Sequence, residues 1–515
     1  MRVELTVSDF LNRAAFVYGP RVAVVDEPDA VGSLGELTYT ELEARARGMA
    51  LGFDHLGVDH GARVAIVSPN SGKFMASYFG VSAYGRVLVP INFRLTSHEM
   101  AYIVEHSGAS VLLYDPELTD VVADIDVAHR FALDGRDDAD LFAPAAPGVR
   151  PLEWPADEES TCSVNYTSGT TARPKGVQLT HRNCWLNAAA FGWHTGVNDR
   201  DVLLHTLPMF HCNGWGMPYA VTGMGGRHVV LRKVDGEDIL SRVEAQGVTL
   251  LCGAPAVVAA ILDAAANRLK EGREIPGRGT VRIVVAGAPP PSKTIERVET
   301  ELGWEFIQIY GLTETAPLLT INRAPSEWDD LSATDRAQRL SRAGVPAIGV
   351  QIDVDDEGEI LARSNHVFAG YWEQPGETAE ALRGGWFHTG DGGYVSDSYV
   401  VISDRKKDVI ITGGENVSSI EVEDCLYQHP AVAEVAVIGV PHEKWGETIK
   451  ALVVPREGVE VSEDDLIAHC RDLLAHFKAP TSVEFRDALD RTATGKLQKY
   501  KLRQSYWTDR DRAIN

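Results

Sequence analysis

The sequence predicts an α/β protein with a large N-terminal α/β region of several subdomains and a small α+β C-terminal domain. Three observations support this prediction. The chain has 515 residues, more than the roughly 250 to 300 residues at which a single hydrophobic core stops growing. Apolar strands alternate with helical stretches over residues 60–290, a pattern typical of α/β proteins. The pattern changes after a charged segment at residues 403–408.

One helix and several strands are well marked in the N-terminal region. Thr96 and Glu99 have the spacing of a capping box, and Gly108 is a typical C-terminal stop for the helix between them. Met100 and Ile103 fall on one face of that helix, which indicates the side that packs on the core. The predicted strands are short apolar runs rich in β-branched residues, namely Val64–Val67, Val87–Pro90, Val111–Tyr114, Val229–Leu231, Val248–Leu251 and Ile283–Ala286.

The charged residues 404–408 separate two apolar strands, and we interpret them as a hinge. This places an N-terminal domain at residues 1–403 and a C-terminal domain at residues 409–515, about the size of an independent folding unit. In the C-terminal part, Ser418 and Glu421 have capping-box spacing at the start of a predicted helix. Two strands are expected after it, Val435–Ile438 and Ala451–Val454.

Composition and charge narrow the class of protein. The formal net charge is −24, so no overall positive field attracts nucleic acid. The six cysteines are far apart and form no C-x-x-C pair, which argues against a zinc ribbon and against a disulfide framework. The N-terminus lacks the apolar segment of a secretion signal, and no run reaches the ~20 apolar residues of a membrane span. We therefore expect a cytoplasmic protein without integral membrane association.

The loop from Tyr166 to Gly176 is rich in hydroxyls and glycines and contains Lys175. Hydroxyl and backbone N–H donors together with a lysine are suited to binding a polyphosphate. The loop is not a Walker A motif, because Pro174 precedes the lysine and Gly176 follows it. Short predicted strands flank the loop on both sides, which favours a phosphate-binding hairpin. The simpler alternative, a polar turn, accounts less well for the lysine and the density of hydroxyls.

Two further segments carry residues suited to binding a nucleotide. The first, QIYGLTE, includes Tyr310, which could stack on a base, Thr313, which could donate to a phosphate, and Glu314, which could bind Mg²⁺. We expect this segment directly after a strand. The second, GWFHTGD, places Asp391 after a glycine in a predicted turn, where its carboxylate could accept hydrogen bonds from ribose hydroxyls.

Two lysine-bearing segments complete the set. The segment DRKKD, at the predicted hinge, offers Arg405 as a nucleotide contact and Lys407 as a pivot. The segment TATGK places Lys496 on a glycine-containing loop far along the chain. Each would by itself be read as a solvated surface segment.

Together the five segments resemble the adenylate-forming superfamily, which includes acyl- and aryl-CoA synthetases, luciferases and nonribosomal adenylation domains. The matched signatures are the phosphate loop, QIYGLTE, GWFHTGD, DRKKDVIITGGENV and TATGK, in the order of the family and over nearly the whole chain. The resemblance implies a reaction in two steps: a carboxylate attacks the α-phosphate of ATP and releases pyrophosphate, and a thiol then attacks the acyl-adenylate.

The resemblance also implies roles for residues at the matching positions. Lys496 would bridge the acid carboxylate and the α-phosphate, Thr313 would contact the α-phosphate, and Lys175 would bind the β- and γ-phosphates. Glu314 would hold Mg²⁺. Further nucleotide contacts are implied for Thr167, Ser168, Gly169, Thr170, Thr171, Gly287, Ala288, Pro289, Tyr310, Gly311, Asp391 and Arg405.

In this family the small domain rotates between the two steps about a hinge, which Lys407 matches by position. The rotation would remove Lys496 from the site and bring Gly413, Gly414 and Glu415 towards the coenzyme A tunnel. Two departures from the family pattern occur, Ala172 in the phosphate loop and Asp490-Arg491 before TATGK. Neither removes a group with an assigned chemical role.

The segment LPMFHCNGWG aligns with the acyl-pocket segment of the family. Members that activate amino acids generally have an aspartate where this chain has His211, so an amino-acid substrate is disfavoured, because its ammonium would lack a partner. The expected pocket residues are His211, Trp215, Gly216, Ala288, Pro289 and Leu312.

We therefore predict an ATP-dependent acid:CoA ligase for an apolar acid, either a medium- or long-chain fatty acid or an aromatic acid. The expected small-molecule partners are the carboxylic acid, ATP with Mg²⁺, and coenzyme A. One alternative is an acyl-AMP ligase that loads the phosphopantetheine of a carrier protein. A second is a catalytically silent nucleotide-binding regulator, which the presence of both Lys496 and Glu314 disfavours. The sequence leaves the oligomeric state and the identity of the acid open.

Overall fold

The structure is a computed structural model that describes residues 1–167, 174–288, 290–405, 408–412, 415–442, 445–491 and 497–507. Its largest sheet, sheet A, has parallel pairing from β1 through β13 and antiparallel strands at both edges. In spatial order, sheet A consists of β15 (Val345–Pro346), β14 (Leu318–Arg323), β13 (Glu305–Gly311), β12 (Arg282–Val285), β11 (Leu250–Gly253), β9 (Val202–His205), β10 (Arg227–Val230), β1 (Val22–Val25) and β2 (Glu36–Thr38).

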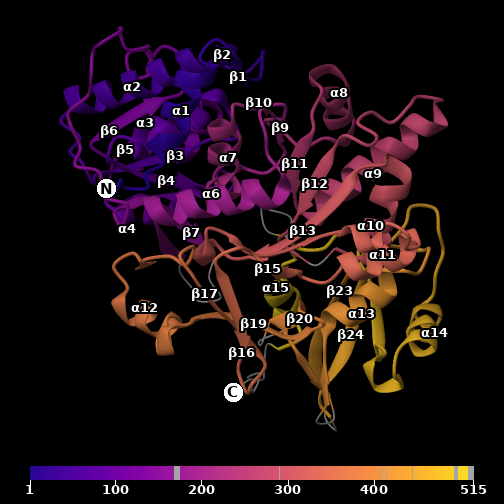
Figure 1. The fold of residues 1–515 in the computed structure, drawn as a ribbon. Helices are drawn as coiled ribbons and strands as arrows, with labels where there is room; N and C mark the ends of the chain where they lie inside the picture. Colours follow the sequence, from indigo (N-terminus) through magenta and orange to yellow (C-terminus); the bar gives the residue numbers. More distant parts are fainter. Residues whose placement is uncertain are drawn as a thin grey trace.

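Sheet B lies beside sheet A (Figure 1) and is also mainly parallel, except for the strands β8 and β18 at one edge. Its order is β18 (Gly370–Tyr371), β8 (Lys175–Thr180), β7 (Thr161–Thr167), β4 (Val87–Ile91), β3 (Arg63–Val67), β5 (Ala109–Tyr114) and β6 (His129–Ala132). One hydrophobic core contains buried residues from both sheets, so the two sheets form a single packed unit.

Helices cover the faces of the two large sheets, and α6 runs between them in Figure 1. Within the described residues, no helix combines the length and the apolar character needed to cross a bilayer. The N-terminal helices are α1 (Ser8–Tyr18), α2 (Tyr39–His55), α3 (Gly72–Ser82), α4 (Ser97–Ser107), α5 (Thr119–Val122), α6 (His181–Thr195), α7 (Met217–Met224), α8 (Gly236–Gln246), α9 (Pro255–Lys270), α10 (Ser292–Arg297), α11 (Ala333–Leu340) and α12 (Pro375–Ala381).

The predicted elements of this region are confirmed. Each predicted strand coincides or overlaps with an observed one, although β11 begins at Leu250, two residues later than expected. The predicted helix is α4, which has Thr96 as its N-cap, a complete capping box with Glu99, and Gly108 in the left-handed conformation at its end. Local capping signals therefore determined the limits of this helix.

Sheet C, which follows, corrects one prediction. It consists of β16 (Val350–Val354), β17 (Glu359–Ser364), β19 (Phe387–Ser396) and β20 (Tyr399–Arg405). Asp391, predicted in a turn, lies inside β19 opposite Arg405 of β20. The strand continues through the glycines because their backbones pair with β17 and β20, with an irregularity in the β20 pairing at Gly392/Gly393. Because β20 extends to Arg405, the predicted hinge at residues 404–408 begins within a strand.

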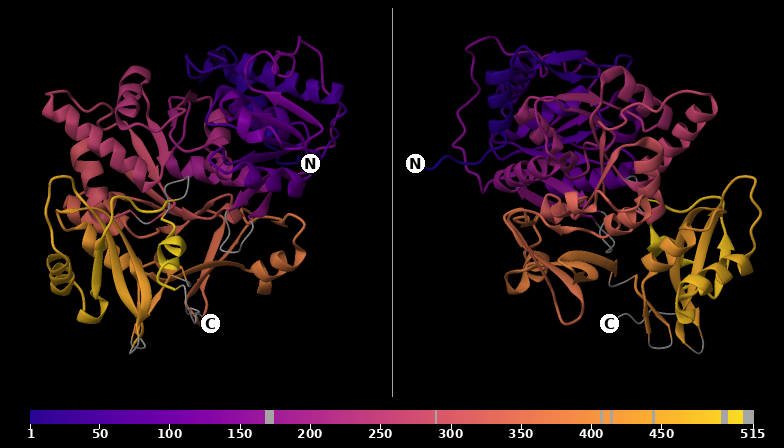
Figure 2. Two further views of the ribbon diagram at one scale, coloured as in Figure 1. Left: turned by 180° about the vertical axis from the view of Figure 1, so that it is seen from behind. Right: turned by 45° about the vertical axis from the view of Figure 1, so that its right-hand side comes forward.

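The described residues between 410 and 507 form a smaller domain with its own sheet and core. Figures 1 and 2 show it beside sheet C, on the same side of the two large sheets. The hydroxyl of Ser418 accepts from the Glu421 N–H at the start of α13, as predicted, while the Glu421 carboxylate pairs with Lys478 at 2.7 Å. The elements are β22 (Glu415–Val417), β21 (Ile410–Thr412), β24 (Gly446–Pro455), β23 (Val432–His442), β25 (Ser482–Phe485), α13 (Ser419–Tyr427), α14 (Glu463–Leu473) and α15 (Lys499–Gln504).

Several histidines are buried in the N-terminal region in their neutral form. The His205 Nε2 and His228 Nδ1 atoms are 3.0 Å apart, and both residues are almost completely buried. Burial lowers the pKa of His205 to about 3 and the pKa of His181 to about 4. The folded protein therefore resists protonation at sites that accept protons readily in the unfolded chain.

We predict that the free energy of unfolding falls as the pH is lowered from 6.5 to 5. In this window the unfolded histidines bind protons while His181 and His205 in the folded state do not. Each such histidine should destabilise the fold by about 1.4 kcal/mol per pH unit. The loss should stop below the folded-state pKa values, about 4 for His181 and about 3 for His205. Urea denaturation at pH 7, 6 and 5 measures the effect.

The variant His181→Gln should show a smaller pH dependence, whereas His476→Gln, at an exposed position, should retain the full dependence. Equal slopes for His181→Gln and the unmodified protein between pH 6 and 5 would contradict the assignment.

Candidate active site

The predicted phosphate loop connects two antiparallel strands. Residue Thr167 at the end of β7 lies opposite Lys175 at the start of β8, which confirms the hairpin and shows that no helix follows the loop. Residues Ser168, Gly169, Thr170 and Thr171 lie outside the described part of the chain. The hairpin nevertheless defines where the loop begins and ends.

The Lys175 side chain is in contact with two residues from a distant part of the chain. Its ammonium forms an ion pair with the Glu377 carboxylate of α12, and its Nζ lies over the Tyr371 ring, 4.9 Å from the centroid. A cation over an aromatic ring at this distance is attracted by the electron-rich face. The lysine predicted to bind phosphate is therefore held in a defined position.

Glu314 belongs to the same cluster. It lies in the short 3₁₀ turn Thr313–Thr315 directly after β13, and its Oε1 accepts a hydrogen bond of 2.9 Å from the Tyr371 hydroxyl. Burial, followed by the neighbouring charge of Glu314, raises the pKa of Tyr371 above its ordinary value, so the phenol is a protonated donor. Carboxylate oxygens are ligands that Mg²⁺ prefers, so the Glu314 carboxylate could hold that ion.

Tyr310 and Asp391 form a second contact between predicted site residues. The Tyr310 hydroxyl donates to Asp391 Oδ2 at 2.8 Å, although the two residues are 81 positions apart. The Arg405 backbone lies opposite Asp391 across the β19–β20 ladder, while the Arg405 side chain is outside the described part. The residue expected at the base and the residue expected at the ribose are thus adjacent.

A buried carboxylate supports the Asp391 segment. Glu359 is 5% exposed; its Oε1 accepts from the Gly390 N–H at 2.8 Å, and its Oε2 lies 3.2 Å from His388 Nδ1. Gly390 has a φ of 73°, a conformation that favours glycine. Glu359 therefore holds the backbone of β19 just before Asp391.

Gly287 and Ala288 are exposed directly after β12. Because β12 and β13 are parallel neighbours with Val285 opposite Gln308, these two residues lie at the same edge of sheet A as Tyr310 and Gly311. Pro289 lies outside the described part. This edge carries the carboxyl ends of the parallel strands, where ligands of α/β sheets usually bind.

The segment predicted to form the acyl pocket adopts a left-handed turn. Residues 212–216 all have positive φ, with values of 38° at Cys212 and 59° at Trp215, a conformation that costs roughly 1–2 kcal/mol for each non-glycine residue. Polar contacts hold the turn: Asn213 Nδ2 donates to Ser163 Oγ at 2.7 Å, and Asn187 Nδ2 donates to the Trp215 carbonyl at 3.2 Å.

The same turn contacts the segment QIYGLTE. The Cys212 thiol donates to the Thr313 carbonyl with a separation of 3.8 Å. Trp215 is 4% exposed, and Leu312 packs against the same core. The structure therefore brings the predicted pocket wall next to the segment QIYGLTE, while His211 and Gly216 lie at the two ends of the turn.

Of the site residues predicted in the hinge and the smaller domain, Glu415 lies in the described part of the chain. Glu415 begins β22 and is exposed. Lys407, Gly413, Gly414 and Lys496 lie outside the described residues. The smaller domain contacts the N-terminal region a few residues after Gly287 and Ala288. There Asp424 Oδ1 of α13 accepts from the Ser292 N–H at 3.1 Å.

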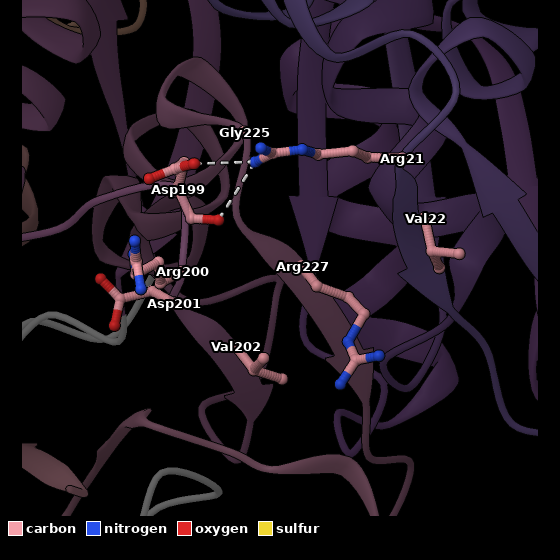
Figure 3. Close-up of a pocket in the computed structure, with 8 residues that line it drawn as sticks. All are labelled: Arg21, Val22, Asp199, Arg200, Asp201, Val202, Gly225 and Arg227. Carbon is pink, nitrogen blue, oxygen red and sulfur yellow. Dashed lines mark hydrogen bonds and ion pairs between the residues drawn. The ribbon is translucent and has the colours of Figure 1, made fainter.

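A surface depression of about 440 Å³ lies elsewhere on sheet A (Figure 3). It is lined by Arg21, Asp199 and Arg227 among others, at the amino ends of β9 and β10. Arg21 pairs with Asp199 at 3.0 Å, so these two lining residues offset each other's charge. Its position at the opposite edge of the sheet separates it from the candidate site.

Tyr371, Glu377 and Glu359 belong to none of the motifs identified in the sequence. The segment Gly370–Tyr371–Trp372 contains an aromatic pair after a glycine, but this pattern is common at strand edges. Only the pairing of β18 with β8 shows that Tyr371 lies beside Lys175.

Comparison with known proteins identifies related enzymes. A model of the AMP-binding enzyme family matches residues 11–372, and a model of the AMP-binding enzyme C-terminal domain matches residues 421–496. The chain is 38% identical to 4-hydroxybutyrate–CoA ligase 2 of Metallosphaera sedula, covering 97% of this chain and 94% of the relative. It is 35% identical to the peroxisomal acetate/butyrate–CoA ligase AAE7 of Arabidopsis thaliana, with the same coverage.

Solved structures show the same architecture. The anthranilate CoA ligase AuaEII in complex with anthranoyl-AMP matches with a TM-score of 0.87 at 26% identity, covering 98% of each chain. ATP-bound MatB from Rhodopseudomonas palustris matches with a TM-score of 0.83 at 29% identity, covering 98% of this chain and 99% of the other. The chain therefore belongs to the AMP-binding enzyme family of the adenylate-forming superfamily, and it is an AMP-forming acid–thiol ligase.

Proposed function

We propose that this protein joins an apolar monocarboxylic acid to coenzyme A at the expense of ATP. In the first step a carboxylate oxygen of the acid attacks the α-phosphorus of ATP, which forms an acyl-adenylate and releases pyrophosphate. In the second step the thiol of coenzyme A loses its proton and attacks the acyl carbon, which releases AMP. The observation that carries the proposal is the convergence of Lys175, Tyr371 and Glu314 beside the Tyr310–Asp391 pair.

The residues at this edge of the sheet suit each part of the nucleotide. Lys175 would bind the β- and γ-phosphates in exchange for its pairing with Glu377. Asp391 would accept from the ribose hydroxyls, and Tyr310 would stack on the adenine, opposite Gly287 and Ala288. Bound at Glu314, Mg²⁺ would offset the negative charge of the phosphates.

The C-terminal residues complete the proposal. Lys496 would offset the repulsion between the acid carboxylate and the α-phosphate as they approach each other. Rotation of the smaller domain about Lys407 would then replace Lys496 with the segment that contains Gly413, Gly414 and Glu415. The contact between Ser292 and Asp424 supports the placement of this domain over the nucleotide edge. Cytoplasmic localisation stays a prediction from the sequence.

The chemistry of the pocket segment supports an apolar acid. His211 and Trp215 provide no carboxylate to pair with a substrate ammonium, and an unpaired buried ammonium is costly. The related ligases are named for small aliphatic acids such as 4-hydroxybutyrate and acetate/butyrate, and one is a trans-cinnamate:CoA ligase. We therefore include short aliphatic acids, together with longer fatty acids and aromatic acids, among the proposed substrates.

Pyrophosphate release with a panel of acids tests the proposed substrate class. Purified protein with ATP, Mg²⁺ and coenzyme A should release pyrophosphate with at least one aliphatic or aromatic monocarboxylic acid. Amino acids of matched size should release roughly 100-fold less, because their ammonium lacks a partner. Pairing isobutyrate with alanine and 3-phenylpropanoate with phenylalanine gives matched shapes. A clear preference for the amino acids would contradict the proposal.

The acceptor is tested with the best acid from this panel. We expect a thioester to form with free coenzyme A and no faster turnover with a phosphopantetheinylated carrier protein. Thioester formation on the carrier alone would identify the protein as a carrier-loading ligase. Mass spectrometry of both acceptors distinguishes the two results.

Replacement of Lys496 separates the two half-reactions. Lys496→Ala should reduce adenylate formation by at least roughly 100-fold, because one fixed charge at a developing anionic centre contributes about 3 kcal/mol or more. Thioester formation from a synthetic acyl-adenylate should remain within about threefold of the unmodified enzyme, since that step uses a different domain orientation. The exposed Lys501 offers a control, and Lys501→Ala should leave both half-reactions intact. Equal loss of both half-reactions in Lys496→Ala would overturn the assigned role.

A further inference from the structure

Tyr371 is held rigidly between two segments of the candidate site. It lies in β18, opposite Val177 of β8. Val177 is two residues after Lys175 in the sequence. The Tyr371 N–H donates to Thr378 Oγ1 at 2.9 Å, and the N–H of the following Trp372 donates to the Gly176 carbonyl at 2.7 Å. The backbone on both sides of the tyrosine is therefore fixed by hydrogen bonds.

The hydroxyl of Tyr371 orients the Glu314 carboxylate. It donates to Oε1 at 2.9 Å, and a hydrogen bond to a charged acceptor is stronger than one between neutral groups. The Glu314 carbonyl also accepts from the Phe368 N–H at 2.8 Å. The segment 368–371 thus holds both the main chain and the side chain of Glu314.

The ring of Tyr371 supports Lys175 on its other side. The Nζ atom lies 4.9 Å from the ring centroid, and the Glu377 carboxylate pairs with the same ammonium. The Glu377 side chain is 55% exposed and the Lys175 side chain is 20% exposed. An ion pair this exposed is weak, so an incoming polyanion can displace the carboxylate while the ring still supports the lysine.

We propose that Tyr371 is a positioning residue of the polyphosphate site: its hydroxyl orients Glu314, its ring supports Lys175, and Glu377 competes with phosphate for that lysine. This inference rests on the proposed function, because it requires that Lys175 and Glu314 bind a nucleotide polyphosphate and its Mg²⁺. Tyr371 holds the two opposite charges in fixed positions: its hydroxyl contacts the Glu314 carboxylate, and its ring contacts the Lys175 ammonium.

Equilibrium binding tests the role of the hydroxyl without turnover. Isothermal titration calorimetry would compare α,β-methylene-ATP with AMP, each with and without Mg²⁺. Tyr371→Phe retains the ring and removes the donor. It should therefore weaken binding of the analogue in Mg²⁺ by roughly tenfold, while AMP binding and Mg²⁺-free binding of the analogue change by less than about twofold.

Tyr371→Leu serves as the matched variant that also removes the ring. It should weaken binding of the analogue further, by several-fold even without Mg²⁺, because the support under Lys175 is lost. A merely structural role for Tyr371 would lower AMP binding and the thermal midpoint in both variants, and that result would overturn the proposal. So would an unchanged Mg²⁺-dependent affinity in Tyr371→Phe.

Replacement of Glu377 should have the opposite effect. Glu377→Gln should bind α,β-methylene-ATP about two- to fivefold more tightly at low salt, with no change for AMP, and the difference should disappear at 0.5 M NaCl. Glu380→Gln is the control, because Glu380 lies on the same helix, carries the same charge and pairs with Arg383 at 2.9 Å. Equal effects of the two variants would show that only the overall negative charge matters. That result would refute a specific competition between Glu377 and phosphate for Lys175.

Failure of the proposed function gives a different result. If the unmodified protein binds neither α,β-methylene-ATP nor AMP, the nucleotide site itself is wrong. If it binds both and the Tyr371 variants match it, only the positioning role is wrong.

Discussion

The pairing of β18 with β8 is the constraint on which the candidate site depends. It joins the hairpin that carries Lys175 to the segment that carries Tyr371, and through the Tyr371 hydroxyl it reaches Glu314 at the end of β13. Three parts of the chain, separated by more than 50 residues from one another, thereby meet at one point. Backbone hydrogen bonds flank β18 on both sides, from the Ala369 N–H to the Gln178 carbonyl and from the Trp372 N–H to the Gly176 carbonyl. The position of the strand therefore does not depend on complete burial of either charge.

Electrostatics at this site is local, in contrast to the charge of the whole protein. The chain carries a net charge of −24, and an anionic nucleotide approaches it against that field. Lys175 supplies positive charge, but here it is paired with an exposed carboxylate.

The left-handed turn at residues 212–216 is a second local feature of the site. Its backbone strain is balanced by buried amide hydrogen bonds from Asn213 and Asn187. That turn brings the pocket segment against Thr313.

The division into two domains matches a reaction that needs different groups at one centre. The smaller domain has its own sheet and cores and meets the large domain near the nucleotide edge through Ser292 and Asp424. Separately packed cores can move as units, which is compatible with the proposed rotation. Lys496 lies outside the described residues, so its role is assigned from the sequence.

The sequence by itself determined the elements whose signals are local. The capping box and terminal glycine of α4, the apolar runs of the parallel strands and the hairpin around Lys175 were all predicted, because each depends on neighbouring residues. The motifs also identified the family, since five of them occur in order. Tertiary structure decided what depends on pairing between distant segments. It placed Asp391 in a strand rather than a turn and brought the Tyr310 hydroxyl within 2.8 Å of its carboxylate. It also brought Tyr371 and Glu359 into the site through strand pairing, and Glu377 through the helix α12 that follows β18. No local pattern encodes such contacts between distant segments.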